Sequence, residues 1–515
     1  MSEIDLLDKW CLIMLRTIRD RALGPTYTAR FQYLVSTILY YVFSCYTNTT
    51  TNCIAEPELK LVGFFPKDRT VNVVDSIIFD SMNYLYDLLG YAKTLIVANK
   101  YTGSINGPQV VSNIKLFLDR RNNDGWAVAN IQPVLPNGSA FIDVETAQDL
   151  NSLLLAKDKW TPLKHKNANP QKYLTPEWGT VKPVENINID KYITIADENY
   201  LANERESEIK EVLEVYKNLN DYQKMIAEFF QGGQVTPPGI WNVLAIYAIR
   251  STKMMYLSAA QFLYLLNTTM FMGSIVAWNV KRKYMQARPI QEIRLLPTQD
   301  VTTFDGSTVN NNIWKPFQQQ NFITPPFPDY ISGHSTFSSG AAVVFERFFP
   351  LSLTQYIFDN FNNECGTMIS SLLNNNSYSN NIKVTMIIAN SSTVVHDTSP
   401  KRFPSCAVKL TFNCWRDMAY FSGISRIYGG IHGNNANNVG LIIGEMIALD
   451  VLNARLIMKQ KGKQLPLQNK HKLIINNNLK NKSNNKTKKI NLKKDDKKDM
   501  KKDDKIKIKK LKSKK

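Results

Sequence analysis

The sequence predicts an all-α protein, because apolar residues recur at helical spacing along most of the chain and only one short strand is expected. The contents of 44% hydrophobic and 21% charged residues are ordinary for a globular protein of 515 residues. The strand is expected at 383–389, inside an irregular Asn- and Ser-rich segment at 371–400. Helices are predicted at 5–22, 27–46, 74–97, 144–156, 193–230, 254–280, 334–350 and 438–460.

Glycine and proline separate several of these helices. Gly24-Pro25 divides the first two, Gly232-Gly233 ends the run at 193–230, and Pro237-Pro238-Gly239 begins the next helix. Residues 101–142 mix turns with short helices. The breaks indicate separate helices joined by connections, and no repeat of the solenoid type is visible.

A long connection is expected from Trp160 to Val184, where the composition changes to Pro, Asn and Lys. It separates two helical halves. The predicted domains are an N-terminal helical half at 1–175, a C-terminal helical bundle at 176–462 and a Lys-rich tail at 463–515.

Residues 254–280 carry no charge, and the stretch is long enough to span a bilayer. No second stretch of this kind exists, which favours a buried core helix in a soluble protein over a membrane-embedded body. Polar residues also interrupt the stretch, namely Gln261, Asn267, Thr268, Thr269 and Asn279.

The formal net charge of +19 belongs to the C-terminal part of the chain. Residues 461–515 hold 22 Lys and 5 Asp, so the rest of the chain is close to neutral. These Lys/Asn/Asp repeats cannot bury a core, and the tail is therefore predicted to be disordered. Its lysines are either simply solvated or make nonspecific contact with a polyanion.

Cysteine usage and the start of the chain favour an intracellular protein. The six cysteines form no C-x-x-C pair, which favours a reduced chain, although an even count leaves disulfides open. The first residues are acidic where a signal peptide would be basic, so no signal peptide is predicted.

The stretch from Phe327 to Gly340 is the strongest candidate for chemistry. A Pro-rich turn leads into Ser332-Gly333-His334, where a helix is predicted to begin. Gly333 lets the backbone approach a ligand closely, and the first N–H groups of a helix favour a negative charge. The stretch is therefore suited to an oxyanion.

Two basic clusters elsewhere in the chain complement this stretch. The first is Lys281-x6-Arg288-Pro289, in which seven residues are close to two helical turns and Pro289 ends the helix. The second is Ser425-Arg426-x5-His432, followed by an Asn run before the last helix. Each alone reads more simply as solvated cations at a helix end or as a satisfied core histidine.

Together the three pieces supply what a tetrahedral oxyanion passing through a five-coordinate state requires. Fixed cations neutralise its equatorial oxygens, and arginine offers paired donors there. One histidine can bond the central atom from one axial side while the other moves protons at the opposite oxygen.

In this order, K-x6-RP, SGH and SR-x5-H resemble the signature of the superfamily of vanadium-dependent haloperoxidases and type 2 phosphatidic acid phosphatases (PAP2). Further segments resemble the haloperoxidase branch, so the likeness spans most of residues 9–458. They are GPTYTAR near the N-terminus, Trp160–Leu163, Gln171–Gly179, and DYQKMIAEFF leading to TPPGIWN at 236–242.

The resemblance implies an all-helical fold of two four-helix bundles with the active site in the second. It also implies that vanadate, or phosphate in its place, is held at its equatorial oxygens by Lys281, Arg288, Ser332, Gly333 and Arg426. His432 would be the axial ligand of vanadium. His334 would be the acid–base group beside the oxygen where hydrogen peroxide reacts with a halide to give hypohalous acid. Trp278 and Phe327 match aromatic positions near the halide in chloroperoxidase-like members.

Three positions depart from the family pattern. Ile331 replaces a proline before Ser-Gly-His. Ala436 stands where an aspartate usually supports the second histidine, and Asn435 or Asn437 is the candidate substitute. Gly232 follows Phe229-Phe230 where the family often has the aspartate that serves His334, so the expected carboxylate partner of His334 is missing.

The sequence therefore leaves three functions open. The first is a vanadate-dependent haloperoxidase. The second is a phosphatase acting on a phosphate ester, with His432 as nucleophile and His334 as acid. The third is a weakly active oxyanion-binding or structural homologue, and a homo-oligomer is compatible with each.

Overall fold

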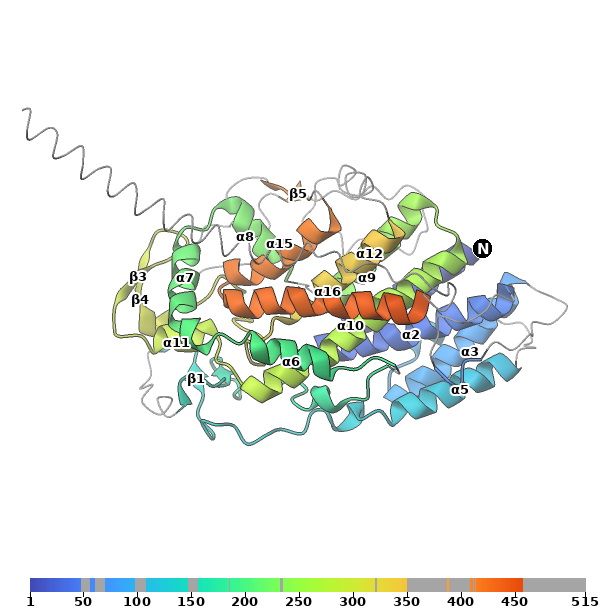
Figure 1. The fold of residues 1–515 in the computed structure, drawn as a ribbon, viewed down its shortest axis with the longest axis horizontal. Coiled ribbons are helices and arrows are strands. Elements are labelled where there is room, and N and C mark those ends of the chain that lie inside the picture. Colours follow the sequence, from blue (N-terminus) through green and yellow to red (C-terminus); the bar gives the residue numbers. More distant parts are fainter. Residues whose placement is uncertain are drawn as a thin grey trace, which may run out of the picture. The chain divides into compact units, whose positions relative to one another are not determined.

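The computed structural model consists mainly of helices, with three short two-stranded sheets among the described residues (Figure 1). The described residues belong to one compact unit, Met1–Lys459. The predictions for the tail, for Gly232-Gly233 and for most of 144–156 and 371–400 lie outside the described residues. The structure describes residues 1–47, 56–60, 70–97, 108–146, 156–184, 186–231, 235–319, 322–349, 387–388, 408–410, 412 and 414–456.

The first helices follow the predicted pattern. Helix α1 (Glu3–Asp20) begins at Ser2, whose side chain and that of Asp5 cap each other's backbone N–H groups. Helix α2 (Pro25–Thr47) begins at the predicted Gly24-Pro25 break, with proline at the position it favours.

The single helix predicted at 74–97 is wrong. Helix α3 (Val71–Leu89) ends at Gly90, which adopts the left-handed conformation (φ 63°), and α4 (Thr94–Val97) follows as a separate turn. Glycine takes this conformation without steric cost, so it stops the helix where the apolar pattern alone would continue it. Helix α5 (Pro108–Asn122) then packs beside α3.

The connection between the halves is irregular, as expected. Between Trp160 and Val184 it contains strand β2 (Leu163–Lys164) and the 3-10 turn η3 (Trp178–Thr180). Strand β2 pairs in parallel with β1 (Ile142–Asp143), which lies before the connection, as does the 3-10 turn η1 (Trp126–Val128). The described start of the helix predicted at 144–156 is not helical: residues 144–146 continue from β1 as bends, and the backbone N–H of Val144 donates to Lys164 O.

Several short helices replace the single run predicted at 193–230. Asn220 caps the last of them through a reciprocal pair of hydrogen bonds with Gln223, which explains one of the breaks. The run comprises α6 (Asp190–Glu198), η4 (Ala202–Glu204), α7 (Arg205–Lys217) and α8 (Asp221–Phe229).

Helix α10 (Tyr256–Tyr284) contains the uncharged stretch and lies in the core. It is the one helix among the described residues that is long and apolar enough to cross a membrane, and 94% of its apolar window is buried inside the fold. Met285 ends it in the left-handed conformation, so the helix stops before Arg288, where the sequence predicted its end. Arg288 is extended and precedes the short helix α11 (Pro289–Arg294).

The remaining elements belong to the C-terminal part of the folded unit. The final helix begins four residues earlier than predicted, because the Asn run after Gly433 forms its first turn instead of a loop. Residues 387–388 are a strand within the segment where one was expected. These elements are α9 (Thr236–Thr252), antiparallel β3 (Asp300–Thr302) and β4 (Thr308–Asn310), η6 (Asn311–Ile313), α12 (Gly333–Phe348), antiparallel β5 (Ile387–Ile388) and β6 (Val408–Lys409), α15 (Trp415–Tyr428) and α16 (Asn434–Leu456).

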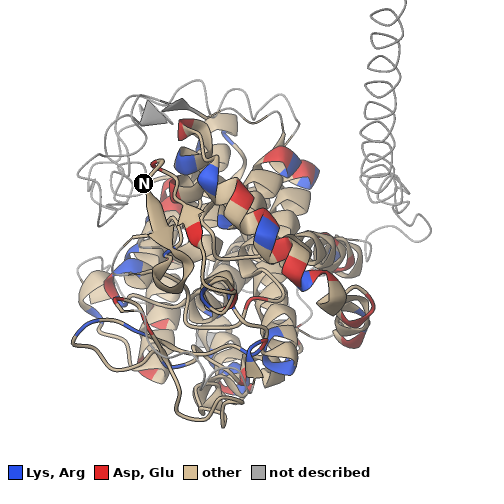
Figure 2. Ribbon diagram, turned by 90° about the vertical axis from the view of Figure 1, so that its left-hand side faces the viewer, with Lys and Arg blue, Asp and Glu red and all other residues tan. Residues whose placement is uncertain are grey.

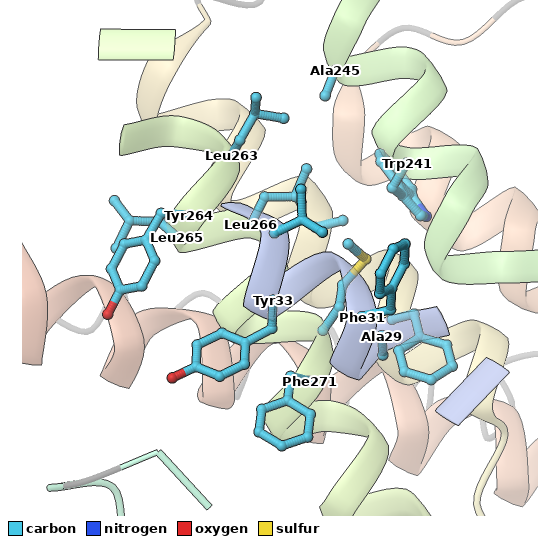
Figure 3. Packing of buried hydrophobic residues seen from close by; sticks show 14 of the residues in the cluster. Ala29, Phe31, Tyr33, Trp241, Ala245, Leu263, Tyr264, Leu265, Leu266 and Phe271 are labelled. Carbon is cyan, nitrogen blue, oxygen red and sulfur yellow. The ribbon is translucent and has the colours of Figure 1, made fainter. Parts of the chain in front are cut away.

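Helix α10 joins two groups of helices. On one side it packs against α2, which contacts α1, α3, α5 and α9. On the other side it packs against α12 and α16, and α15 closes this group with α8 (Figure 1). Figure 3 shows the packing on the first side, where the rings of Tyr33 (α2) and Phe271 (α10) stack with centroids 4.9 Å apart. Both groups of helices therefore share one hydrophobic core, and α10, which lies in that core, holds Lys281 in its last turn.

Acidic and basic residues are interspersed along the helices of the folded unit (Figure 2). Helix α7 is an example, since its sequence alternates Arg, Glu and Lys and includes the ion pair Lys210–Glu206. The mixture agrees with the near-neutral charge of this part of the chain.

Candidate active site

The Ser-Gly-His stretch forms the start of α12. Ser332 is the residue before the helix, and its hydroxyl accepts a hydrogen bond from the N–H of Ser335 at 3.3 Å. The N–H of Ser332 donates to the carbonyl of Ala436 (2.9 Å), which fixes α12 against α16. Gly333 and His334 are the first two helical residues, so the positive end of the α12 dipole lies at this stretch.

Lys281 and Arg288 both reach the backbone just before α12. Lys281 lies in the last turn of α10, and its Nζ donates to the carbonyls of Pro328 (2.7 Å) and Asp329 (2.9 Å). Arg288 donates from Nε to the carbonyl of Phe327 (2.8 Å) and from Nη1 to the carbonyl of Ile431 (2.7 Å). The two cations are thus brought to one segment by a helix end and an extended turn.

Arg288 also faces His432. Its Nη1 lies 3.0 Å from His432 Nε2, and both side chains are buried. The other terminal nitrogen of Arg288, Nη2, is buried without a hydrogen-bond partner among the described residues. Leaving a buried guanidinium donor unpaired is costly, so its position beside the His432 ring indicates a place for an acceptor.

The partner of His432 differs from the one expected. Neither Asn435 nor Asn437 bonds the ring: Asn435 pairs with the Asn199–Leu201 connection, and Asn437 accepts from Ser335. Both residues lie in the first turn of α16, which begins at Asn434, and their side chains bond these other partners. Instead, Nδ1 of His432 bonds the carboxylate of Asp329.

Arg426 and His334 come from two further elements. Arg426 lies in the last turn of α15, and its Nε donates to Ser425 Oγ (2.9 Å) while its Nη2 donates to the carbonyl of Ala227. His334 Nε2 lies 3.0 Å from the carbonyl of Phe230. The partner of His334 is therefore a backbone carbonyl, in agreement with the missing carboxylate noted in the sequence.

These side chains act on one another electrostatically. Burial and the charge of Arg288 lower the pKa of Lys281 well below its usual value and lower that of Arg426 to about 9. Burial lowers the pKa of Arg288 itself to about 10 against the opposing effect of Asp329. The carboxylate of Asp329 opposes this effect at Lys281 and Arg288, whereas Arg426 is affected by burial and by Arg288. An oxyanion among these buried cations would relieve their mutual repulsion.

The aromatic pair Trp278 and Phe327 borders the cations. Their ring centroids are 4.9 Å apart, and Lys281 Nζ lies 5.1 Å from the Phe327 centroid and 5.9 Å from that of Trp278. The indole of Trp278 also lies against Gly333. These rings supply an apolar wall beside a positive charge.

Sequence reasoning missed Asp329 and Arg205. Asp329 is fully buried, and Arg205 Nη2 donates to its Oδ2 at 2.8 Å. Glu292 and Glu208 also pair with Arg205, so its charge is balanced within the protein. A carboxylate in the otherwise apolar turn before Ser-Gly-His was a usable signal for Asp329. Arg205, in a run of charged residues, offered none.

The donors fit an oxyanion such as vanadate. They are guanidinium, ammonium, hydroxyl and helix N–H groups, and they include the unpaired Nη2 of the guanidinium that contacts the His432 ring through Nη1. Across the described ranges, by contrast, no group of three or more His, Cys, Asp or Glu side chains is placed to hold a metal cation. The chemistry of these side chains therefore fits an anion better than a metal cation.

The fold is a helical-bundle fold of the haloperoxidase type. Residues 261–458 match the family model of the VCPO second helical-bundle domain. This match covers the C-terminal part of the chain, and together with the fold it supports the predicted likeness to the vanadium haloperoxidase and PAP2 superfamily.

Solved structures of vanadium-dependent enzymes share the fold at low sequence identity. A bacterial vanadium-dependent iodoperoxidase is 19% identical over 87% of this chain and 96% of that chain, with a TM-score of 0.56. The holo form of a bacterial vanadium-dependent chloroperoxidase is 15% identical over 84% of this chain and 93% of that chain, with a TM-score of 0.60. The apo form of a bacterial vanadium-dependent chloroperoxidase is 14% identical over 84% of this chain and 95% of that chain, with a TM-score of 0.58. A search of curated proteins finds no match.

Acidification should destabilise the anion-free protein. Burial and Arg288 lower the pKa of His432 to about 3, and burial with Arg426 and His432 lowers that of His334 well below 6.5. Between pH 6.5 and 3 the unfolded chain binds these protons and the folded chain does not. The free energy of unfolding should therefore decrease as the pH is lowered, by up to about 1.4 kcal/mol per pH unit for each histidine.

Urea titrations at pH 7 and pH 5 in phosphate-free buffer measure this loss. The His432→Ala variant should show a smaller difference between the two pH values than the unmodified protein. His165→Ala, which removes a histidine outside the site, should leave it unchanged. Equal pH dependence in the unmodified protein and in His432→Ala would contradict the expectation.

Proposed function

We propose that the protein is a vanadate-dependent haloperoxidase, which oxidises a halide with hydrogen peroxide. The observation that carries the proposal is the buried Arg288 Nη2 without a hydrogen-bond partner among the described residues, on the guanidinium whose Nη1 lies 3.0 Å from His432 Nε2. Because Nδ1 of His432 bonds Asp329, Nε2 is the nitrogen that faces this guanidinium. An anion that also accepts a bond from imidazole suits this arrangement. The vanadium-dependent enzymes that share the fold support the choice of vanadate.

The side chains divide into binding and proton-handling groups. His432 would bond the central atom through Nε2, and bound vanadate supplies an electrophilic centre that activates hydrogen peroxide. Because a carbonyl only accepts, His334 donates Nε2–H to Phe230 O, which leaves Nδ1 to take up a proton from peroxide. The groups that would neutralise the anion are Lys281, Arg288, Ser332, Gly333 and Arg426.

The halide is proposed to lie near the aromatic pair. Trp278 and Phe327 exclude water from one side, and Lys281 Nζ lies over both rings, so a weakly hydrated anion would be attracted there. The buried position of α10 supports a soluble protein, and we infer an intracellular one.

Bromination of an activated dione by purified protein with vanadate, hydrogen peroxide and bromide tests the proposal. Iodide and chloride are assayed in parallel. Turnover should exceed that of the same concentration of free vanadate and should fall to that background in the His334→Ala variant. Activity no greater than free vanadate with all three halides would refute the peroxidase function.

A phosphatase is the second candidate. In the His432–Asp329 pair, the carboxylate of Asp329 could support His432 as the nucleophile that attacks a phosphate ester. In that case a phosphate ester would be cleaved without added metal, and vanadate would inhibit competitively. Phosphate release that persists in His432→Ala would exclude this reading. A protein that binds phosphate tightly and turns over neither substrate would instead be an oxyanion-binding homologue.

A further inference from the structure

The carboxylate beside His432 comes from an unexpected part of the chain. Position 436, four residues after the histidine, holds alanine, and its carbonyl is used to fix Ser332. Asp329, about a hundred residues earlier and just before α12, bonds Nδ1 of the same ring. Both Asp329 and His432 are buried, so solvent does not provide an alternative partner.

Asp329 is held in place from several directions. Its Oδ2 accepts from Arg205 Nη2 (2.8 Å) and from the N–H of Gly433 (3.3 Å). Its own carbonyl oxygen accepts from Lys281 Nζ (2.9 Å). Because Oδ2 already accepts two donors, Oδ1 is the oxygen left for the imidazole, and the carboxylate cannot rotate without losing both bonds.

This orientation selects one tautomer of His432. A carboxylate only accepts, so Nδ1 carries the proton and donates it to Asp329. Nε2 then presents its lone pair, which agrees with Arg288 Nη1, an obligatory donor, lying 3.0 Å away. The nitrogen with the lone pair is the one that could bond an electrophilic atom.

We propose that Asp329 is the positioning residue of His432 and replaces the carboxylate missing at position 436. It holds the imidazole in the Nδ1–H tautomer with Nε2 directed to the anion site. This inference rests on the proposed oxyanion function for its purpose, but the tautomer itself is a property of the protein alone.

Asp329→Asn is the sharpest test because the amide cannot reproduce the carboxylate. Its oxygen should pair with Arg205 and the Gly433 N–H, since two donors face it there. Its NH₂ group then faces Nδ1, which must accept, and the proton moves to Nε2. Vanadate affinity should fall by about 10- to 100-fold, the usual effect of losing the partner of a ligating histidine.

Nitrogen NMR of protein labelled on its five histidines measures the tautomer without vanadate. The His432 signals are assigned by their loss in His432→Ala. The unmodified protein should show Nδ1–H, and Asp329→Asn should show Nε2–H. Nε2–H in the unmodified protein, or no change in Asp329→Asn, would overturn the proposal, and the first result does not depend on the folding of Asp329→Asn.

Glu292→Gln is the matched control. Glu292 also pairs with Arg205 and is largely buried, but it does not bond His432. A purely structural role for the carboxylates predicts equal losses of vanadate affinity in Glu292→Gln and Asp329→Asn. Retention of Nδ1–H and of affinity in Glu292→Gln alone supports the positioning role.

Adding Ala436→Asp to Asp329→Ala tests the replacement directly. Recovery of Nδ1–H and of vanadate binding would show that either position can supply the carboxylate, and no recovery would refute the replacement. An unmodified protein with the Nδ1–H tautomer but no halide oxidation would refute the proposed function and leave the inference on Asp329 standing.

Discussion

Replacing His432 with alanine should reduce halide oxidation by about 10³-fold or more, to the level of free vanadate. The variant removes the ring nitrogen that faces Arg288 and leaves Asp329 without the imidazole that it bonds. Steady-state bromination measures the loss. If the protein is a phosphatase instead, ester hydrolysis should fall by a similar factor, because the same nitrogen would be the nucleophile.

Controls must show that the loss of activity in His432→Ala comes from the missing ring and not from unfolding. His165→Ala removes a histidine that follows β2, outside the site, and should retain full activity. Circular dichroism and thermal unfolding of His432→Ala should show a folded protein, since Arg288 still donates to the carbonyls of Phe327 and Ile431 and Asp329 is still paired with Arg205. A folded His432→Ala variant with more than a tenth of normal activity would exclude His432 as the essential group.

The helices could be predicted from the sequence because their patterns are local. The break at Gly24-Pro25 and the start of α12 after Ser332 both come from residues with strong backbone or capping preferences. The ends at Gly90 and Met285 were missed. Each depends on a single residue taking the left-handed conformation, which apolar periodicity does not reveal.

Lys281 and Arg288 lie close together as predicted, but helical spacing is not what brings them together. Lys281 and Arg288 were paired by helical spacing, but α10 ends at Tyr284 and Arg288 is extended. Their side chains meet because both donate to carbonyls of residues 327–329. Motif order could therefore identify the residues, whereas the contact that brings them together is between distant segments and has no sequence period.

Asp329 was not identified from the sequence because its contact with His432 is also between distant segments. The departure at Ala436 was visible in the sequence, yet the compensating carboxylate lies at a separation of 103 residues. A single sequence offers no measure of such a pairing. The buried cations Arg205 and Arg288 also depend on tertiary contacts, because burial decides whether a charge is solvated or must find a partner.

Replacing Arg288 with alanine should weaken binding of phosphate or vanadate by about 10²–10³-fold, the usual effect of removing one preorganised donor to a charged oxygen. The variant deletes the unpaired Nη2 and the Nη1 that faces His432. Isothermal titration with phosphate measures the affinity. For the unmodified protein, phosphate at 100 times its Kd should add about 2.7 kcal/mol to the free energy of unfolding and raise Tm.

Arg294→Ala separates anion binding from the loss of a buried arginine. Arg294 is also buried, burial likewise lowers its pKa to about 10, and it donates only to the carbonyls of Trp314, Asp143 and Val144. Both variants leave buried carbonyls unpaired, which costs about 1–3 kcal/mol for each group. Only Arg288→Ala should lose the rise in Tm with phosphate. If both variants keep it, Arg288 does not contact the anion, and the other proposed groups must hold the anion without it.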